Sequence, residues 1–140
     1  WAASEGWFRG WLQNSYVQGN FTLMDSEVDL GEDAGQATNV RRRLQGQAET
    51  VLNLQLGYDG ERYDWSVLFN RAGTSGEPDI FQEPVGDLDF VWGYQPAERW
   101  KWKFKAQNLL NPDIQFRQGN KIERSLTKGI DFGLSVEYGL

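Results

Sequence analysis

Apolar and polar residues alternate along much of this chain with a period of two. The C-terminal segment 130–140 shows the pattern without a break. Ile130, Phe132, Leu134, Val136, Tyr138 and Leu140 alternate there with Asp131, Gly133, Ser135, Glu137 and Gly139. A strand directs alternate side chains to opposite faces. The segment therefore predicts a strand with one apolar face and one small or charged face, whereas no part of the chain has a convincing helical stripe.

The same alternation recurs upstream and predicts about six strands. The apolar sets are Leu52, Leu54, Leu56 and Tyr58; Trp65, Val67 and Phe69; Leu88, Phe90, Trp92 and Tyr94; and Trp100, Trp102, Phe104 and Ala106. Another strand is expected at about 12–24, where Val17, Phe21 and Leu23 share a face with Gly19. Leu68 is an exception, because the alternation places it on the polar face.

The expected connections alternate between short and long. Residues 59–62 and 95–99 are predicted to be tight turns, and Asp59-Gly60 is expected to supply the positive φ that a short hairpin needs. Residues 25–48, 71–86 and 109–128 are predicted to be long polar loops at the opposite end of the sheet. Short turns at one end and long loops at the other are typical of bacterial outer-membrane barrels. The pattern therefore predicts an all-β fold, an antiparallel up-and-down transmembrane β-barrel segment.

Composition narrows the function classes. The chain has 20 acidic and 14 basic residues, a balance that argues against a nucleic-acid partner. It has no Cys and no His, which removes disulfides, thiolate sites and the usual general base. No stretch of about 18 apolar residues predicts a transmembrane helix, but a transmembrane strand needs apolar residues only at alternate positions.

Aromatic residues support the same arrangement. Tyr58, Tyr94, Trp100 and Tyr138 each lie on an apolar strand face beside a short turn or the C-terminal end. Aromatic side chains prefer the membrane–water interface, so these four are predicted to belong to a periplasmic girdle. The alternative is ordinary cross-strand packing in a soluble sheet.

Four segments resemble one protein family. They are Asp25–Gly31, Leu44–Gln47 followed by Val51–Leu54, Pro78–Pro84, and Lys105–Pro112. In this order they resemble the C-terminal β-barrel region of TonB-dependent outer-membrane receptors, over roughly residues 12–140. Residues 1–140 are accordingly interpreted as the C-terminal portion of such a barrel, without a plug domain.

The resemblance implies a function and partners. It implies uptake of a scarce small-molecule ligand (a siderophore, another metal chelate or an oligosaccharide) across the bacterial cell outer membrane, driven by the TonB complex. The implied partners are the lipid bilayer, lipopolysaccharide, the plug and the remainder of a barrel of about twenty-two strands. The family usually ends on an aromatic residue. This chain instead ends on Leu140, with Tyr138 on the same face.

Candidate chemistry gives no catalytic site. Asp87 and Asp89 share a face, but a water-filled barrel wall explains them without acid–base work. Lys101, Lys103 and Lys105 form a stripe that either steers an anion or, as we favour, pairs with acidic residues of neighbouring strands or the plug.

Two charged motifs lie in the predicted long loop 25–48. Arg41-Arg42-Arg43 could contact lipopolysaccharide phosphates, although a solvated charge run is the simpler interpretation. Gly31-Glu32-Asp33 with Asp25 and Asp29 lacks the ligand spacing of a calcium loop. We assign no metal, no cofactor and no enzymatic activity. Ligand-binding residues stay unknown, because the family's sites are assembled from many loops and the plug.

The alternation also predicts which side chains face lipid and which face the interior. Phe132, Leu134, Val136, Leu54, Leu56, Phe90, Trp102 and Phe104 are predicted to face lipid. Asp131, Ser135, Asn53, Gln55, Asp89, Lys103 and Lys105 are predicted to face the interior. Six strands cannot close a barrel, so further strands must come from other sequence or another chain.

Two other functions fit the same pattern. The first is a passive outer-membrane channel or a structural β-barrel subunit of a larger outer-membrane complex, which would lack the plug and the TonB-engaging segment. The second is a soluble lipid-binding barrel. Its apolar faces should point inward around one ligand, whereas the polar faces of this chain are too charged for a solvent-free interior and too regular for accident, so this function is disfavoured.

Overall fold

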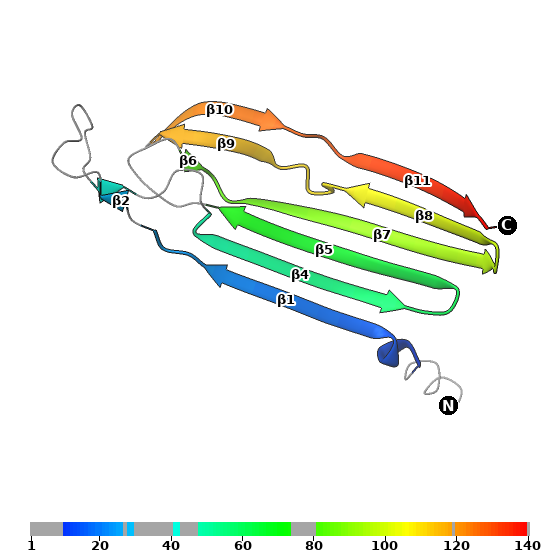
Figure 1. Ribbon diagram of the computed structural model, residues 1–140. Helices are drawn as coiled ribbons and strands as arrows, with labels where there is room; N and C mark the ends of the chain where they lie inside the picture. Colours follow the sequence, from blue (N-terminus) through cyan, green and yellow to red (C-terminus); the bar gives the residue numbers. More distant parts are fainter. Residues whose placement is uncertain are drawn as a thin grey trace, which may run out of the picture.

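The computed structural model describes residues 10–26, 28–29, 41–42, 48–73, 81–118 and 120–139. This part of the chain is all-β with antiparallel sheets, as the alternation predicts (Figure 1). A single helical turn over residues 10–13 precedes the first strand. Among the described residues, no helix is long and apolar enough to cross a membrane.

The main sheet has six strands in the order β1-β4-β5-β7-β8-β11. Their bounds are β1 Ser15–Leu23, β4 Thr50–Asp59, β5 Tyr63–Gly73, β7 Val85–Ala97, β8 Trp100–Gln107 and β11 Asp131–Tyr138. Each strand pairs antiparallel with the next of these along the chain, which is the predicted up-and-down order. Both predicted short turns, β4–β5 and β7–β8, lie at the end of the sheet where β11 ends (Figure 1).

The positive φ predicted for Gly60 in the turn at 59–62 is wrong. Gly60 does not have a positive φ; among the described residues only Asn108, Asn111 and Gly129 do. Residues 60–62 form a three-residue connection in which the Gly60 amide donates to the Tyr63 carbonyl at 3.2 Å. A Cβ atom on Gly60 would lie 2.5 Å from the Tyr58 ring, so a larger residue here would require the Tyr58 side chain to move.

The predicted long loops contain more structure than the sequence indicated. β5 runs on to Gly73 and β7 begins at Val85, which leaves a shorter connection than 71–86. Within 109–128, β9 Asp113–Gln118 and β10 Lys121–Thr127 form a hairpin, and β9 also pairs with β6 Phe81–Gln82. Ile114 packs here as a buried side chain, and an Arg117–Glu83 ion pair of 2.7 Å links β9 to the β6 segment. Of loop 25–48, the structure describes little beyond the pairing of β2 Val28–Asp29 with β3 Arg41–Arg42.

A hydrogen-bonded kink joins this outer hairpin to the main sheet. Asn108 and Asn111 have φ values of 56° and 42°, and Gly129 on the returning segment has a φ of 88°. The Asn108 Nδ2 atom donates to the Gly129 carbonyl, and the Gly129 amide donates to Asn111 Oδ1 at 3.0 Å. The two segments therefore bend together, and β9 and β10 extend beyond β8 and β11 (Figure 1).

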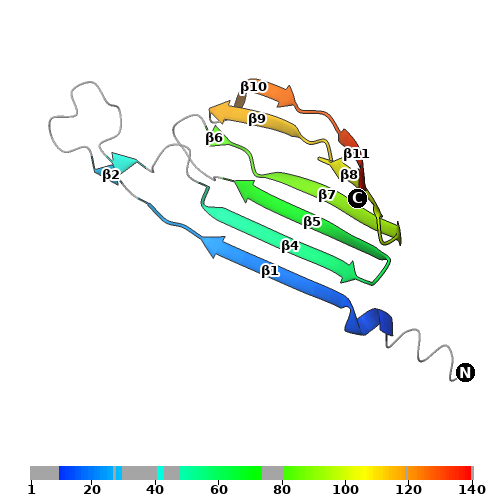
Figure 2. The ribbon, with the colours of Figure 1, turned by 45° about the vertical axis from the view of Figure 1, so that its right-hand side comes forward.

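The main sheet is one curved layer with almost no core. Its edge strands β1 and β11 do not pair with each other (Figures 1 and 2). Among the described residues, only Ala106 at 3% exposure and Ile114 at 9% are buried apolar side chains. A soluble sheet of this size normally packs one face against another layer, whereas no second layer covers the main sheet within the described residues.

Candidate functional site

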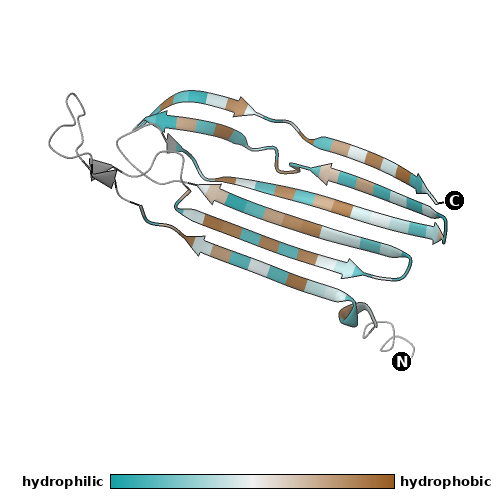
Figure 3. Ribbon diagram, viewed as in Figure 1, coloured by the Kyte–Doolittle hydropathy of each residue, from teal (hydrophilic) through white to brown (hydrophobic). Residues whose placement is uncertain are grey.

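The strand register gathers the apolar residues on one face of the sheet. One row of aligned residues crosses all six strands: Val17, Leu56, Val67, Phe90, Ala106 and Phe132. The next row along the strands contains Tyr58, Trp65, Trp92, Phe104 and Leu134. All eight residues predicted to face lipid lie on this face, which we call the apolar face. Figure 3 shows the alternation along each strand.

The apolar face is open to its surroundings. Val17 is 77% exposed and Leu134 is 65% exposed, although both lie within strands. On β4 the opposite face is the better covered one: Asn53 and Gln55 are half-buried, whereas Leu54 and Leu56 are exposed. On β8 the order is reversed, because Lys103 and Lys105 are exposed and Ala106 is buried. The distribution on β4 is the reverse of that in a soluble protein, where polar groups lie in water and apolar groups are covered.

Aromatic side chains on the apolar face concentrate at the end with the short turns. Three ring pairs lie there: Tyr58 with Tyr63 at 5.5 Å between centroids, Trp92 with Tyr94 at 5.7 Å, and Trp100 with Tyr138 at 4.8 Å. The predicted grouping of Tyr58, Tyr94, Trp100 and Tyr138 at one end of one face is confirmed by the register. Trp65 and Trp102 lie next to these four residues. Together the six residues form an aromatic band that crosses five strands.

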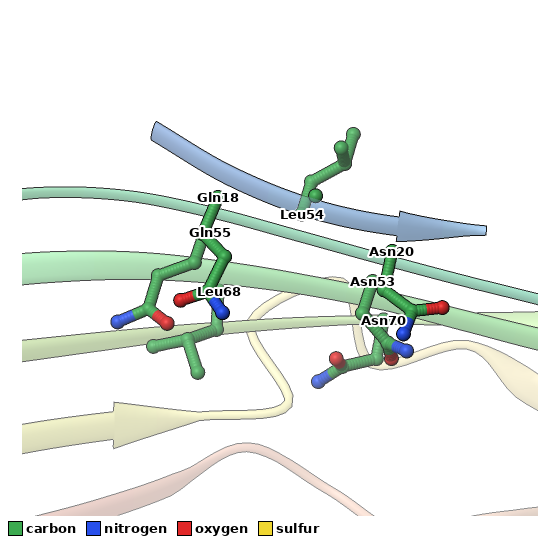
Figure 4. Close-up of a pocket in the computed structure, with 8 residues that line it drawn as sticks. Gln18, Asn20, Asn53, Leu54, Gln55, Leu68 and Asn70 are labelled. Carbon is green, nitrogen blue, oxygen red and sulfur yellow. The ribbon is translucent and has the colours of Figure 1, made fainter. Parts of the chain in front are cut away.

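The opposite face, which we call the polar face, carries two rows of amide side chains. Asn20, Asn53 and Asn70 are aligned on β1, β4 and β5, and Asp87 of β7 continues their row. Gln18 and Gln55 are aligned in the neighbouring row, which continues through Leu68 to Asp89. Figure 4 shows the amide side chains and Leu68 on one side of the sheet, while Leu54 points to the other.

A shallow hollow of about 150 Å³ lies among these amides. It is lined by Gln18, Gly19, Asn20, Asn53, Leu54, Gln55, Leu68 and Asn70. At its border, the Tyr16 ring occupies the space above Gly57, where a Cβ atom would lie 2.4 Å from the ring. Gln55 Nε2 donates to the Tyr16 hydroxyl at 3.1 Å and fixes this arrangement. We call this set, with Tyr16, the amide hollow.

The charged residues singled out in the sequence lie beside the amide hollow on the same face. Asp89 Oδ1 accepts a hydrogen bond of 2.9 Å from the Asn108 amide, so it supports the kink. Asp87 Oδ1 is buried without a hydrogen-bond partner among the described residues. Lys101 lies opposite Glu137, and Lys103 opposite Ser135, but within the described part of the chain no ion pair joins Lys101, Lys103 or Lys105 to an acidic side chain. The expected pairing with neighbouring strands is therefore not formed there.

The loop candidates lie largely outside the described residues. Arg43, Gly31, Glu32 and Asp33 are outside them, as are the segments 44–47 and 78–80 of the family resemblance. For Arg41, Arg42 and Asp29 only the backbone pairing is described. No group of three or more potential metal ligands occurs within the described ranges.

Sequence reasoning missed the amide hollow. The signal was present as amides two residues apart, Gln18 and Asn20 on β1 and Asn53 and Gln55 on β4. Only the register shows that these pairs lie side by side.

No protein-family model matches the chain, no curated protein matches it, and no solved structure matches it.

Proposed function

We propose that this chain forms part of the wall of an outer-membrane β-barrel, with its apolar face against lipid and its polar face toward the interior. The supporting observation is the division of the sheet into two faces: rows of aligned apolar residues, many of them exposed, cover one face, and amide and charged side chains lie on the other. Burial of apolar surface is worth roughly 25 cal/mol per Å². If the apolar face were in contact with water, burial of its side chains would contribute nothing to the stability of the fold.

The dimensions fit a membrane. Five of the six strands carry four consecutive apolar-face residues, for example Leu52 to Tyr58 and Phe132 to Tyr138. Seven residues of strand span ~20 Å, comparable with the apolar band of about 25 Å in outer-membrane barrels. The aromatic band at the short-turn end corresponds to the interfacial girdle of such barrels.

The open edges call for additional strands. Unpaired backbone groups in hydrocarbon cost several kcal/mol each, so β1 and β11 need partners in a bilayer. We propose that further strands, from the same protein or from another chain, complete the barrel. The specific function that we propose, ligand uptake driven by TonB, rests on the resemblance of segments such as Lys105–Pro112 to TonB-dependent receptors. A passive channel or structural subunit is the alternative.

Two measurements test the proposal. The complete protein, reconstituted in vesicles with brominated lipids, should show strong quenching of the tryptophans on the apolar face, because bromine quenches only rings that contact acyl chains. Unchanged fluorescence of a folded protein in those vesicles would contradict the barrel. Ligand uptake by cells carrying the complete gene should cease when TonB is deleted; uptake that persists at full rate would favour the passive channel.

A further inference from the structure

We propose that the amide hollow binds neutral, hydroxyl-rich solutes, with a neutral glycan as the ligand class. The inference rests on the proposed barrel, because an inward polar face puts the hollow on the path of a solute. It goes beyond that proposal by naming residues and the chemistry that they recognise.

The first argument comes from unused hydrogen-bonding capacity. The side chains of Gln18, Asn53 and Asn70 have no hydrogen-bond partner among the described residues, and Asn53 and Asn70 are half-buried. Each amide offers two N–H donors and a carbonyl acceptor. A sugar hydroxyl is also both donor and acceptor, so adjacent hydroxyls can satisfy adjacent amides. The polar atoms of Asn53 and Asn70 are not buried from solvent, so their donors and acceptors are accessible to such a ligand.

The second argument comes from Tyr16. Its ring is 41% exposed and lies across Gly57 next to the amides, held by the hydrogen bond from Gln55. Leu68 adds an apolar side chain within the hollow. Sugar rings are amphipathic, with C–H groups on their faces and hydroxyls at their edges. The aromatic ring can contact the C–H face of a sugar while the neighbouring amides bind its hydroxyls.

The third argument concerns charge. The amide rows themselves are neutral, and each continues into a carboxylate on β7, Asp87 in one row and Asp89 in the other. An anionic solute in the hollow would meet these carboxylates, and repulsion of this kind contributes to selectivity. Lys103 and Lys105 lie on β8, one strand further from the hollow than β7, so the carboxylates are the nearer charged groups. A peptide backbone offers similar donors and acceptors, but the exposed tyrosine ring favours the glycan.

The experiment uses the complete protein in lipid vesicles and four probes. These are maltohexaose and cellohexaose as neutral glycans, hexagalacturonate as the anionic comparison, and hexaglycine as the peptide comparison. We expect saturable binding of at least one neutral glycan and weaker binding of hexagalacturonate. Gln18→Leu, Asn53→Leu and Tyr16→Leu should each weaken glycan binding about fivefold, the effect expected for one hydrogen bond or ring contact.

Gln107→Leu is the matched control for Gln18→Leu. Both are exposed glutamines on the polar face without a side-chain partner among the described residues, but Gln107 lies on β8 outside the hollow. Binding should change less than twofold in the control. Because Gln18 lies on the exposed edge strand, its variant should fold even if the half-buried Asn53→Leu variant does not.

Three results would overturn the inference. They are no saturable binding of either neutral glycan by folded protein, an equal loss in Gln107→Leu, and tighter binding of hexaglycine than of both glycans, which would assign the hollow to a polypeptide. Insertion is measured on the same samples by quenching with brominated lipid. Failure of glycan binding with intact insertion refutes the glycan site alone, whereas failure of insertion refutes the barrel.

Discussion

A Cβ atom on Gly73 would lie 2.4 Å from the Cα atom of Pro84, so the end of β5 is in contact with the backbone that leads into β7. Gly73 is buried, and its carbonyl accepts a hydrogen bond of 3.0 Å from the Glu49 amide. Neither backbone can move away without disturbing the pairing of three strands. Glycine is therefore required at this position for steric reasons.

We expect Gly73→Ala to destabilise the protein by about 1–3 kcal/mol, the usual cost of overpacking. The measurement is the midpoint of urea unfolding of the complete protein. Gly133→Ala on β11 is the control, because the nearest atom to its added Cβ is Lys105 Cβ at 4.0 Å. Equal stability of the two variants would show that Pro84 does not constrain Gly73.

A second prediction concerns Gly129, which lies in the kink. Gly129 has a φ of 88°, a conformation that costs a β-branched residue roughly 1–3 kcal/mol. We expect Gly129→Val to destabilise the hairpin by that amount and Gly129→Asn by much less, because asparagine tolerates positive φ. Hydrogen exchange of the β9 and β10 amides is the measurement. Similar exchange rates in the Val and Asn variants would contradict the role of backbone conformation.

The lipid-facing assignment is tested most sharply on β11. Leu134 lies on the apolar face opposite Phe104, and Ser135 lies on the polar face opposite Lys103. If the apolar face meets lipid, Leu134→Arg should cost roughly 2–4 kcal/mol near the bilayer midplane. Ser135→Arg should cost much less, because its side chain enters a polar interior. The two positions are adjacent, so strand position and local propensity are nearly matched.

The measurement for this pair is the free energy of folding into lipid vesicles. A plug in the barrel interior would raise the cost of Ser135→Arg, so a variant lacking any plug gives the cleanest comparison. Equal tolerance of arginine at the two positions, or a larger loss at Ser135, would mean that the faces are assigned in reverse.

Protease accessibility tests the orientation of the two ends. Arg62 lies exposed in the turn between β4 and β5, and Lys121 lies exposed at the tip of the β9–β10 hairpin, at the other end of the sheet. Trypsin added to intact cells should cut after Lys121 and should reach Arg62 only once the outer membrane is permeabilised. Early cleavage at Arg62 would place the short turns outside the cell.

The sequence alone determined which residues form the main strands and which side chains share a face. Alternation of side chains follows from local backbone geometry, so Phe132, Leu134 and Val136 had to lie on one face once the segment was extended. The exceptional position of Leu68 on the polar face was predictable for the same reason. The two antiparallel pairs joined by 59–62 and 95–99 also followed, because these connections are too short for anything but a hairpin.

Only the tertiary structure decided what depends on partners distant in sequence. The sequence predicts a loop where the structure has the β9–β10 hairpin. The strands of this hairpin pair with each other and with β6, outside the main sheet. The sequence predicts a positive φ at Gly60, whereas the structure gives this residue no positive φ and places the Tyr58 ring beside it. The amide hollow joins Gln18 to Gln55 and Asn20 to Asn70, and no local pattern specifies such pairs. Register is set by the packing and hydrogen bonds of whole strands, so contacts across strands emerge only when the sheet is assembled.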